Sequence, residues 1–341
     1  MFHSKECSSD VESPDNKQVM ESLINSDKNV MDEDDGHAYS SMDDFYEDAH
    51  NFNKNAKWKR WRFYIIIASL GIANCGDATE IGSMNYILSS SDFQSDIIQQ
   101  DFQNRGASIA SSIYFGMLIG GITTGAYGDG FMGRRPTLLM GLIINGISGI
   151  CSALSINSLM MCFCRFMSGL GVGAVMSSLL TLVTELSPPS YRGFYITIVA
   201  SFFTFGMIYV SSLAMLLIPL KYSWRLYACL CALPCVAGCI CVFCFVPESP
   251  RYLGNQGLYS KSALMANELA RSMGYHHRKL SKEDIEIFFQ KSSKDSQQNS
   301  SPEKKNSAMQ RIALLYKKPL LHKSIALHIV WCALCFGSGR Y

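Results

Sequence analysis

Long apolar runs recur along this chain and constrain its fold more than any other feature. A helix of about 20 residues, rising 1.5 Å per residue, crosses the roughly 30 Å of hydrocarbon in a bilayer. Six runs of at least about that length follow one another after Phe63, at residues 63–88, 107–127, 136–156, 159–183, 194–218 and 226–246. The sequence therefore predicts an all-α, polytopic membrane protein with six spans, in which frequent glycines let the helices pack closely.

Charge divides the rest of the chain into segments. Residues 1–50 hold fourteen Asp and Glu against three Lys, so they cannot bury enough apolar surface to fold. We expect a disordered acidic cytoplasmic tail at 1–57 with no cleavable signal peptide, the six-helix bundle at 58–246, and a polar loop at 247–321. Apolar sequence resumes near Ser324 and stops at Tyr341. This predicts a truncated seventh helix at 322–341, in a chain that is one half of a longer fold.

Basic residues predict the orientation of the spans. They are concentrated before the first run, between the second and third, and between the fourth and fifth, as Lys54, Lys57, Lys59, Arg60, Arg62, Arg134, Arg135 and Arg192. The loop between the first and second runs, which lies on the opposite side of the membrane, carries Asp92, Asp96 and Asp101 instead. By the positive-inside rule, the N-terminus and the 247–321 loop are cytoplasmic. The sequence does not distinguish a plasma-membrane protein from a vesicle protein.

The thirteen cysteines do not predict a metal site. Most of them lie inside the apolar runs, six of them between residues 226 and 246, where no His or carboxylate accompanies them, and Cys commonly packs as a small apolar residue. No cofactor is expected. No nucleophile and base are arranged as in an enzyme, and nucleic acid is not an expected partner.

Three ionisable residues lie inside the runs and are the candidate functional centre. Asp77 and Glu80 share one face of the first helix at i and i+3, and Arg165 lies in the fourth. A charge at the bilayer centre costs at least about 2.5–3.5 kcal/mol, so such residues normally face a cavity and pair. Counted from the helix starts, Asp77 and Arg165 both lie about 9 Å below the outer edge. We therefore expect Arg165 to pair with Asp77, and Glu80 to be the more titratable acid.

Two interpretations of these three charges remain open. Either they bind a proton or a cationic substrate, or they form a static salt bridge that holds the first and fourth helices together. We favour the first interpretation, because buried ion pairs contribute little stability over apolar residues of similar size.

A second group of charged residues and glycines is expected on the cytoplasmic face. Three motifs supply it: Gly125-x-x-x-Asp129 followed by Gly133-Arg134-Arg135, Glu185 followed by Arg192-Gly193, and Pro247-Glu248-Ser249-Pro250-Arg251. Glycines permit a tight turn and close helix approach, and carboxylates accept hydrogen bonds from arginines or helix N-termini. We expect these residues to form one gating network.

In this order and on these faces, the motifs resemble those of the major facilitator superfamily. Its loop motif reads Gly-x-x-x-Asp-Arg-x-Gly-Arg-Arg, and here Gly130-Phe131-Met132 stand in place of Arg-x. Within the superfamily, the Asp77-x-x-Glu80 pair and the run Phe163-Cys-Arg-Phe-Met-Ser-Gly are most similar to the synaptic-vesicle-glycoprotein branch. The resemblance covers roughly residues 58–341. Hexose carriers are less similar, because residues 194–218 lack the Gln of their sugar site.

The resemblance implies a secondary active transporter of a small organic solute, either an organic ion or a sugar-like molecule. It would work by alternating access of two six-helix halves. Asp77, Glu80 and Arg165 would bind the solute or a coupled proton, and the cytoplasmic motifs would close the inward side. The alternative is a transport-inactive vesicle membrane protein that acts through partner binding. Without a second half, we expect membrane lipid to meet the three charges, and the chain not to transport alone.

Overall fold

Helices account for all of the regular structure among the residues that the structure describes. The computed structural model describes residues 39–52, 60–98, 102–220, 222–275, 278–298, 316–318 and 320–338. Its helices are α2 (Met42–Phe52), α3 (Trp61–Ile87), α4 (Ser91–Phe93), η2 (Gln94–Ile98), α5 (Phe102–Phe131), α6 (Arg134–Ala153), α7 (Ser158–Leu186), η3 (Pro189–Tyr191), α8 (Arg192–Leu217), α9 (Trp224–Phe245), α10 (Pro250–Asn255), α11 (Tyr259–Ser272), α12 (Lys282–Gln298) and α14 (Leu321–Ser338). The predicted all-α fold class is confirmed.

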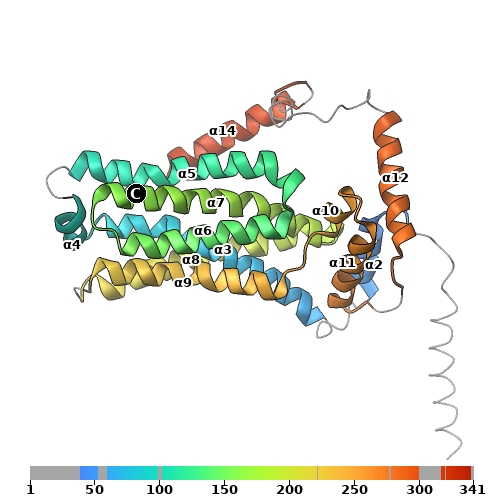
Figure 1. Ribbon diagram of the computed structural model, residues 1–341, viewed down its shortest axis with the longest axis horizontal. Coiled ribbons are helices and arrows are strands. Elements are labelled where there is room, and N and C mark those ends of the chain that lie inside the picture. Colours follow the sequence, from blue (N-terminus) through green and yellow to red (C-terminus); the bar gives the residue numbers. More distant parts are fainter. Residues whose placement is uncertain are drawn as a thin grey trace, which may run out of the picture. The chain divides into compact units, whose positions relative to one another are not determined.

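The long helices α3 and α5–α9 lie side by side as a bundle (Figure 1). Among the described residues, five segments are long and apolar enough to cross a membrane: Arg105–Gly125, Arg134–Ala153, Ser158–Leu186, Pro189–Leu217 and Trp224–Phe245. The predicted first span is not among them, although α3 has 27 residues and is therefore about 40 Å long. The reason is its composition, because α3 contains several polar residues that lower its mean hydropathy, including Asn74, Asp77, Thr79, Glu80 and Ser83.

Glycines bring α5 and α7 into backbone contact, as the sequence predicts. A Cβ atom built on Gly169 of α7 would lie 2.1 Å from the carbonyl oxygen of Ile113 in α5. One turn further, a Cβ on Gly173 would lie 2.4 Å from the carbonyl oxygen of Met117. Membrane helices pack by van der Waals contact rather than by exclusion of water, and small residues at the interface permit that contact.

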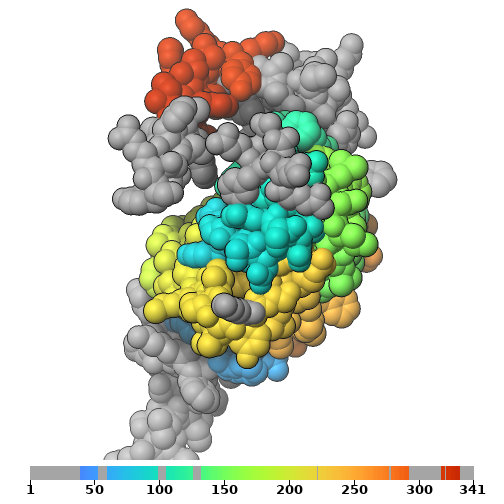
Figure 2. All heavy atoms as spheres, turned by 90° about the vertical axis from the view of Figure 1, so that its left-hand side faces the viewer, coloured from blue at the N-terminus to red at the C-terminus, as the bar shows by residue number. Residues whose placement is uncertain are grey.

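Trp224 packs at one end of the bundle, where α4, η2 and the start of α9 lie. Its ring packs edge-on against Phe93 with 5.0 Å between centroids, and its Nε1 donates to Asp96 Oδ2 at 3.2 Å. The next residue, Arg225, donates to the carbonyl oxygens of Ala153 and Ser155 at 2.9 and 2.8 Å. Figure 2 looks onto this end and shows the α4–η2 segment, in cyan, beside the start of α9, in yellow. The Trp224-Arg225 pair therefore fixes the start of α9.

At the other end, α10 and α11 lie where α3 begins and α9 ends (Figure 1). The structure also places helix α2 here, between residues 42 and 52. The prediction of a disordered tail extending to residue 57 is therefore wrong for this stretch. Its apolar residues fall on one face, at the i, i+3, i+4 and i+7 spacing of an amphipathic helix, and are buried: Met42, Phe45, Tyr46 and Ala49. The acidic composition of residues 1–57, taken as a whole, obscures this short apolar pattern.

Candidate functional site

The centre of the bundle contains a buried ion pair between α3 and α7. Arg165 Nη1 donates to Glu80 Oε2 at 3.0 Å, and both side chains are 1% exposed. The same guanidinium donates to Ser83 Oγ at 3.3 Å and to Ser152 Oγ of α6 at 2.9 Å. Partners on two helices, α3 and α6, therefore hold Arg165 of α7 in one position.

Asp77 lies one turn before Glu80 and has a different partner. Asn145 of α6 donates from Nδ2 to Asp77 Oδ1 at 3.1 Å, and Ser168 of α7 donates to Asn145 Oδ1 at 2.6 Å. The predicted Arg165–Asp77 pair is therefore wrong: Arg165 is level with Glu80, and Ser168, three residues later, is level with Asp77. A count of residues from helix starts does not determine how two packed helices are shifted along each other.

This chain's own helices enclose the three charges. Asp77 is 0% exposed, and Glu80 and Arg165 are each 1% exposed. The expectation that lipid would meet these groups in the absence of a second half is therefore wrong. Room for Glu80 comes from Gly149 of α6, where an added Cβ would lie 2.1 Å from Glu80 Oε1. Among the described residues, neither Asp77 Oδ2 nor Glu80 Oε1 has a hydrogen-bond partner.

A second charged cluster lies where α6 begins. Gly133 has a φ of 94°, a conformation that a residue with a side chain rarely adopts, and it turns the chain into α6. The backbone N–H groups of Arg134 and Arg135 both donate to Glu248 Oε1 at 3.1 Å, and that of Ser249 donates at 2.9 Å. Glu248 therefore caps α6, where a carboxylate also interacts favourably with the helix dipole. Burial raises the pKa of the Glu248 carboxyl, and these N–H donors oppose the shift.

Other members of the predicted cytoplasmic network pair across helices. Arg134 Nη2 lies 3.4 Å from Glu185 Oε1 of α7, which links the start of α6 to the end of α7. Arg135 Nη2 donates to the carbonyl oxygen of Phe243 in α9 at 2.6 Å. An added Cβ on Gly125 or Gly193 would meet nothing within 4 Å. Asp129 belongs to α5, and its side chain lies outside the described part of the structure.

Asp43 of α2 joins the two remaining arginines and is absent from the sequence-based prediction. Arg192 Nη2 lies 2.5 Å from Asp43 Oδ1, and Arg251 Nη2 contacts the same oxygen. Burial lowers the pKa of Arg251. The same helix also places His50 against the start of the bundle, where Arg60 Nη1 donates to His50 Nε2 at 3.2 Å. The apolar spacing of residues 42–49 is the signal that would have identified α2 in the sequence.

Replacing Asp43 with asparagine is expected to loosen α2 without unfolding the bundle. One neutral amide would replace the carboxylate shared by two arginines, and half-exposed ion pairs of this kind contribute about 0.2–1 kcal/mol each. Hydrogen exchange of residues 42–52 should therefore become roughly 2- to 30-fold faster. Asp48→Asn is the matched control, because Asp48 is exposed on the same helix. Unchanged exchange in Asp43→Asn would show that the apolar face alone holds α2.

Comparison with known proteins agrees with this architecture. Residues 64–330 match the protein family described as "Sugar (and other) transporter". The chain belongs to this family. This family is one of transporters and not of enzymes. Among the described residues, no group of three or more His, Cys, Asp or Glu side chains is placed to hold a metal ion.

Similar proteins extend this family assignment. The chain is 28% identical to human synaptic vesicle glycoprotein 2C over 216 residues, covering 60% of this chain and 28% of that protein. It is 26% identical to rat synaptic vesicle glycoprotein 2A over 247 residues, covering 68% of this chain and 32% of that protein. The chain thus spans about a third or less of the length of these curated relatives. The predicted resemblance to this branch is confirmed.

Solved structures show the same fold at low sequence identity. The xylose transporter XylE from E. coli, in a partially occluded inward-open conformation, has a TM-score of 0.57 and 19% identity, covering 69% of this chain and 60% of that chain. XylE bound to 6-bromo-6-deoxy-D-glucose, a proton:xylose symporter of the major facilitator superfamily, has a TM-score of 0.55 and 18% identity, covering 68% and 54%. The bundle therefore has part of the major facilitator fold.

Proposed function

We propose that this chain supplies the six-helix bundle of a secondary active transporter for a small sugar-like solute, working by alternating access. Membership of the sugar (and other) transporter family supports the solute class. Similarity to XylE, a proton:xylose symporter, supports the same class of solute and also supports coupling of its transport to a proton. In this proposal the N-terminus, α2 and α10–α12 are cytoplasmic, as the positive-inside rule indicates.

The enclosed carboxylates carry the proposal of proton coupling. Glu80 has its counter-ion in Arg165 at 3.0 Å, whereas the hydrogen-bond partner of Asp77 is the neutral amide of Asn145. A charge without a counter-ion is costly inside a membrane protein. Asp77 is therefore the proposed proton-binding residue, and the Glu80–Arg165 pair is its electrostatic neighbour. This reverses the roles that helix counting assigned to the two acids.

The second cluster is proposed to hold the cytoplasmic side closed. Its contacts join the start of α6 to the end of α7 through Arg134–Glu185, and to the segment after α9 through Glu248. The Asp43 contacts add α2, the start of α8 and α10 to this group. Alternating access requires one part of a transporter to move against another, and the Asp43 contacts, whose side chains are about one-third exposed, cost little to break. These contacts would therefore open and close without a large barrier.

Uptake by proteoliposomes tests this function. The complete gene product that contains this chain is reconstituted, and entry of radiolabelled pentoses and hexoses is followed with an inward proton gradient. Saturable uptake that a protonophore abolishes is the expected result. Saturable uptake that is unchanged when the protonophore is added would refute proton coupling. Absence of uptake by a folded protein would favour the alternative, a membrane protein that acts through partners.

A further inference from the structure

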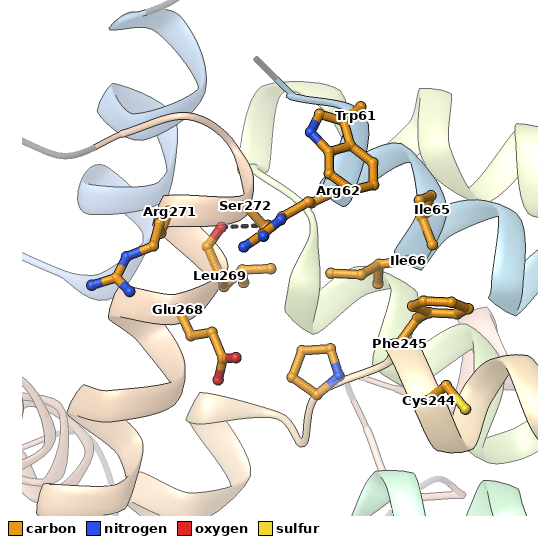
Figure 3. Close-up of a pocket in the computed structure, with 11 residues that line it drawn as sticks. Trp61, Arg62, Ile65, Ile66, Cys244, Phe245, Glu268, Leu269, Arg271 and Ser272 are labelled. Carbon is orange, nitrogen blue, oxygen red and sulfur yellow. Dashed lines mark hydrogen bonds between the residues drawn. The ribbon is translucent and has the colours of Figure 1, made fainter. Parts of the chain in front are cut away.

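A cavity of about 390 Å³ lies outside both charged clusters. The first turn of α3, the end of α9 and helix α11 form its walls, so it lies where two long helices of the bundle meet a helix of the following loop (Figure 3). Lining residues that matter for its chemistry are Trp61, Arg62, Ile66, Phe245 and Glu268. The transport proposal uses none of them.

Arg62 supplies the positive charge of this cavity. Figure 3 shows its side chain extending into the cavity toward Leu269 and Ser272, whereas Arg271 points away. The Arg62 Cζ atom lies 5.5 Å from the centre of the Trp61 ring. Ser272 donates its hydroxyl proton to the carbonyl oxygen of Leu269 at 2.6 Å. Within the described part of the chain, no carboxylate forms an ion pair with Arg62.

Glu268 supplies a negative charge on the α11 side of the same cavity. No salt bridge joins Glu268 to Arg62 or Arg271 among the described residues, so the two opposite charges face the cavity from different helices. A single ligand that carries both an anionic and a cationic group matches this arrangement. An arginine fork binds phosphate well, and a carboxylate binds a primary ammonium.

The remaining wall is apolar and belongs to the membrane-crossing helices. Ile65 and Ile66 extend the α3 side, and Phe245, which is 52% exposed, ends α9. Trp61 is also 52% exposed, in the position of an interfacial aromatic residue. The cavity therefore places charged groups beside apolar groups at the level where α9 leaves the bilayer. A phospholipid has the same sequence of groups, from headgroup to acyl chain.

We propose that this cavity binds a membrane phospholipid whose headgroup carries both a phosphate and a primary ammonium. Arg62 binds the phosphate, Glu268 binds the ammonium, and Ile66 with Phe245 contacts the start of the acyl chains. Basic pockets between membrane helices on the cytoplasmic side are known to bind phospholipid headgroups. Assignment to the cytoplasmic leaflet rests on the orientation in the proposed function. The binding itself needs only that the bundle lies in a membrane.

Native mass spectrometry of the delipidated, purified chain tests the proposal. Phosphatidylethanolamine, phosphatidylcholine and phosphatidylglycerol with the same acyl chains are added separately. Phosphatidylethanolamine is expected to bind about tenfold more tightly than phosphatidylcholine, and Arg62→Gln should remove most of this binding, since it removes a charge-assisted hydrogen bond. Glu268→Gln should lower the preference for phosphatidylethanolamine over phosphatidylglycerol. Lys261→Gln is the control, because Lys261 is exposed on α11 outside the cavity.

Cys244 reports where the lipid binds, because it is exposed and lines the cavity. Phosphatidylethanolamine should slow alkylation of Cys244, measured on its peptide, and leave alkylation of the half-buried Cys151 in α6 unchanged. Soluble phosphoethanolamine should not protect Cys244, which separates a lipid from a free phosphate compound. Wild-type lipid binding by Arg62→Gln, or equal binding of all three lipids, would overturn the proposal. Neither measurement involves uptake, so its failure is distinct from failure of the proposed function.

Discussion

Replacing Arg165 with methionine is expected to destabilise the bundle by about 3–5 kcal/mol, the usual cost of removing one partner of a buried ion pair. The variant would leave the Glu80 carboxylate inside the bundle without its counter-ion, and Ser152 Oγ without its donor. Most of the protein should then aggregate or be lost during extraction in detergent. Yield of monodisperse protein and the midpoint of thermal unfolding measure this effect.

The double variant Glu80→Gln with Arg165→Met separates loss of the pair from loss of volume. With both charges removed, no uncompensated charge stays buried, so most of the stability should return. Arg105→Met serves as a control for loss of a cation, because Arg105 is exposed at the start of the second span. A double variant as unstable as Arg165→Met alone would show that the serine contacts, and not Glu80, determine the role of Arg165.

Replacing Asp77 with asparagine is expected to abolish proton-driven uptake while the protein stays folded. An asparagine keeps an oxygen that can accept a hydrogen bond from Asn145, but it cannot bind and release a proton as a carboxylate does. A proton gradient can no longer drive solute through such a variant, so accumulation should fall to equal solute concentrations on the two sides of the membrane. Radiolabelled uptake with and without a proton gradient measures the loss.

Exchange of solute across equilibrated membranes is the internal control for Asp77→Asn. This exchange needs no net proton movement, so the variant should retain it if the bundle is intact. Glu80→Gln differs, because it leaves Arg165 without a counter-ion and should lower stability as well as transport. Wild-type accumulation and wild-type pH dependence in Asp77→Asn would reduce this residue to a structural role.

Properties that depend on short stretches of chain could be predicted from the sequence. The helix composition of the bundle follows from runs of apolar residues whose length matches a bilayer. The sequence also indicates where helices approach closely, because a glycine such as Gly169 leaves room for backbone contact wherever its partner lies. The motifs that resemble the major facilitator superfamily are likewise local, and the family match bears them out.

The choice of partner for each charge depended on the tertiary structure. Asp77 and Glu80 are three residues apart on one helix face, and only the shift of α7 along α3 decides which of them meets Arg165. Enclosure of these charges depends in the same way on α6, where Gly149 leaves space for Glu80. Asp43 meets Arg192 and Arg251 across more than a hundred residues of sequence. Such contacts follow from how separate helices pack, and no local pattern in the chain encodes that packing.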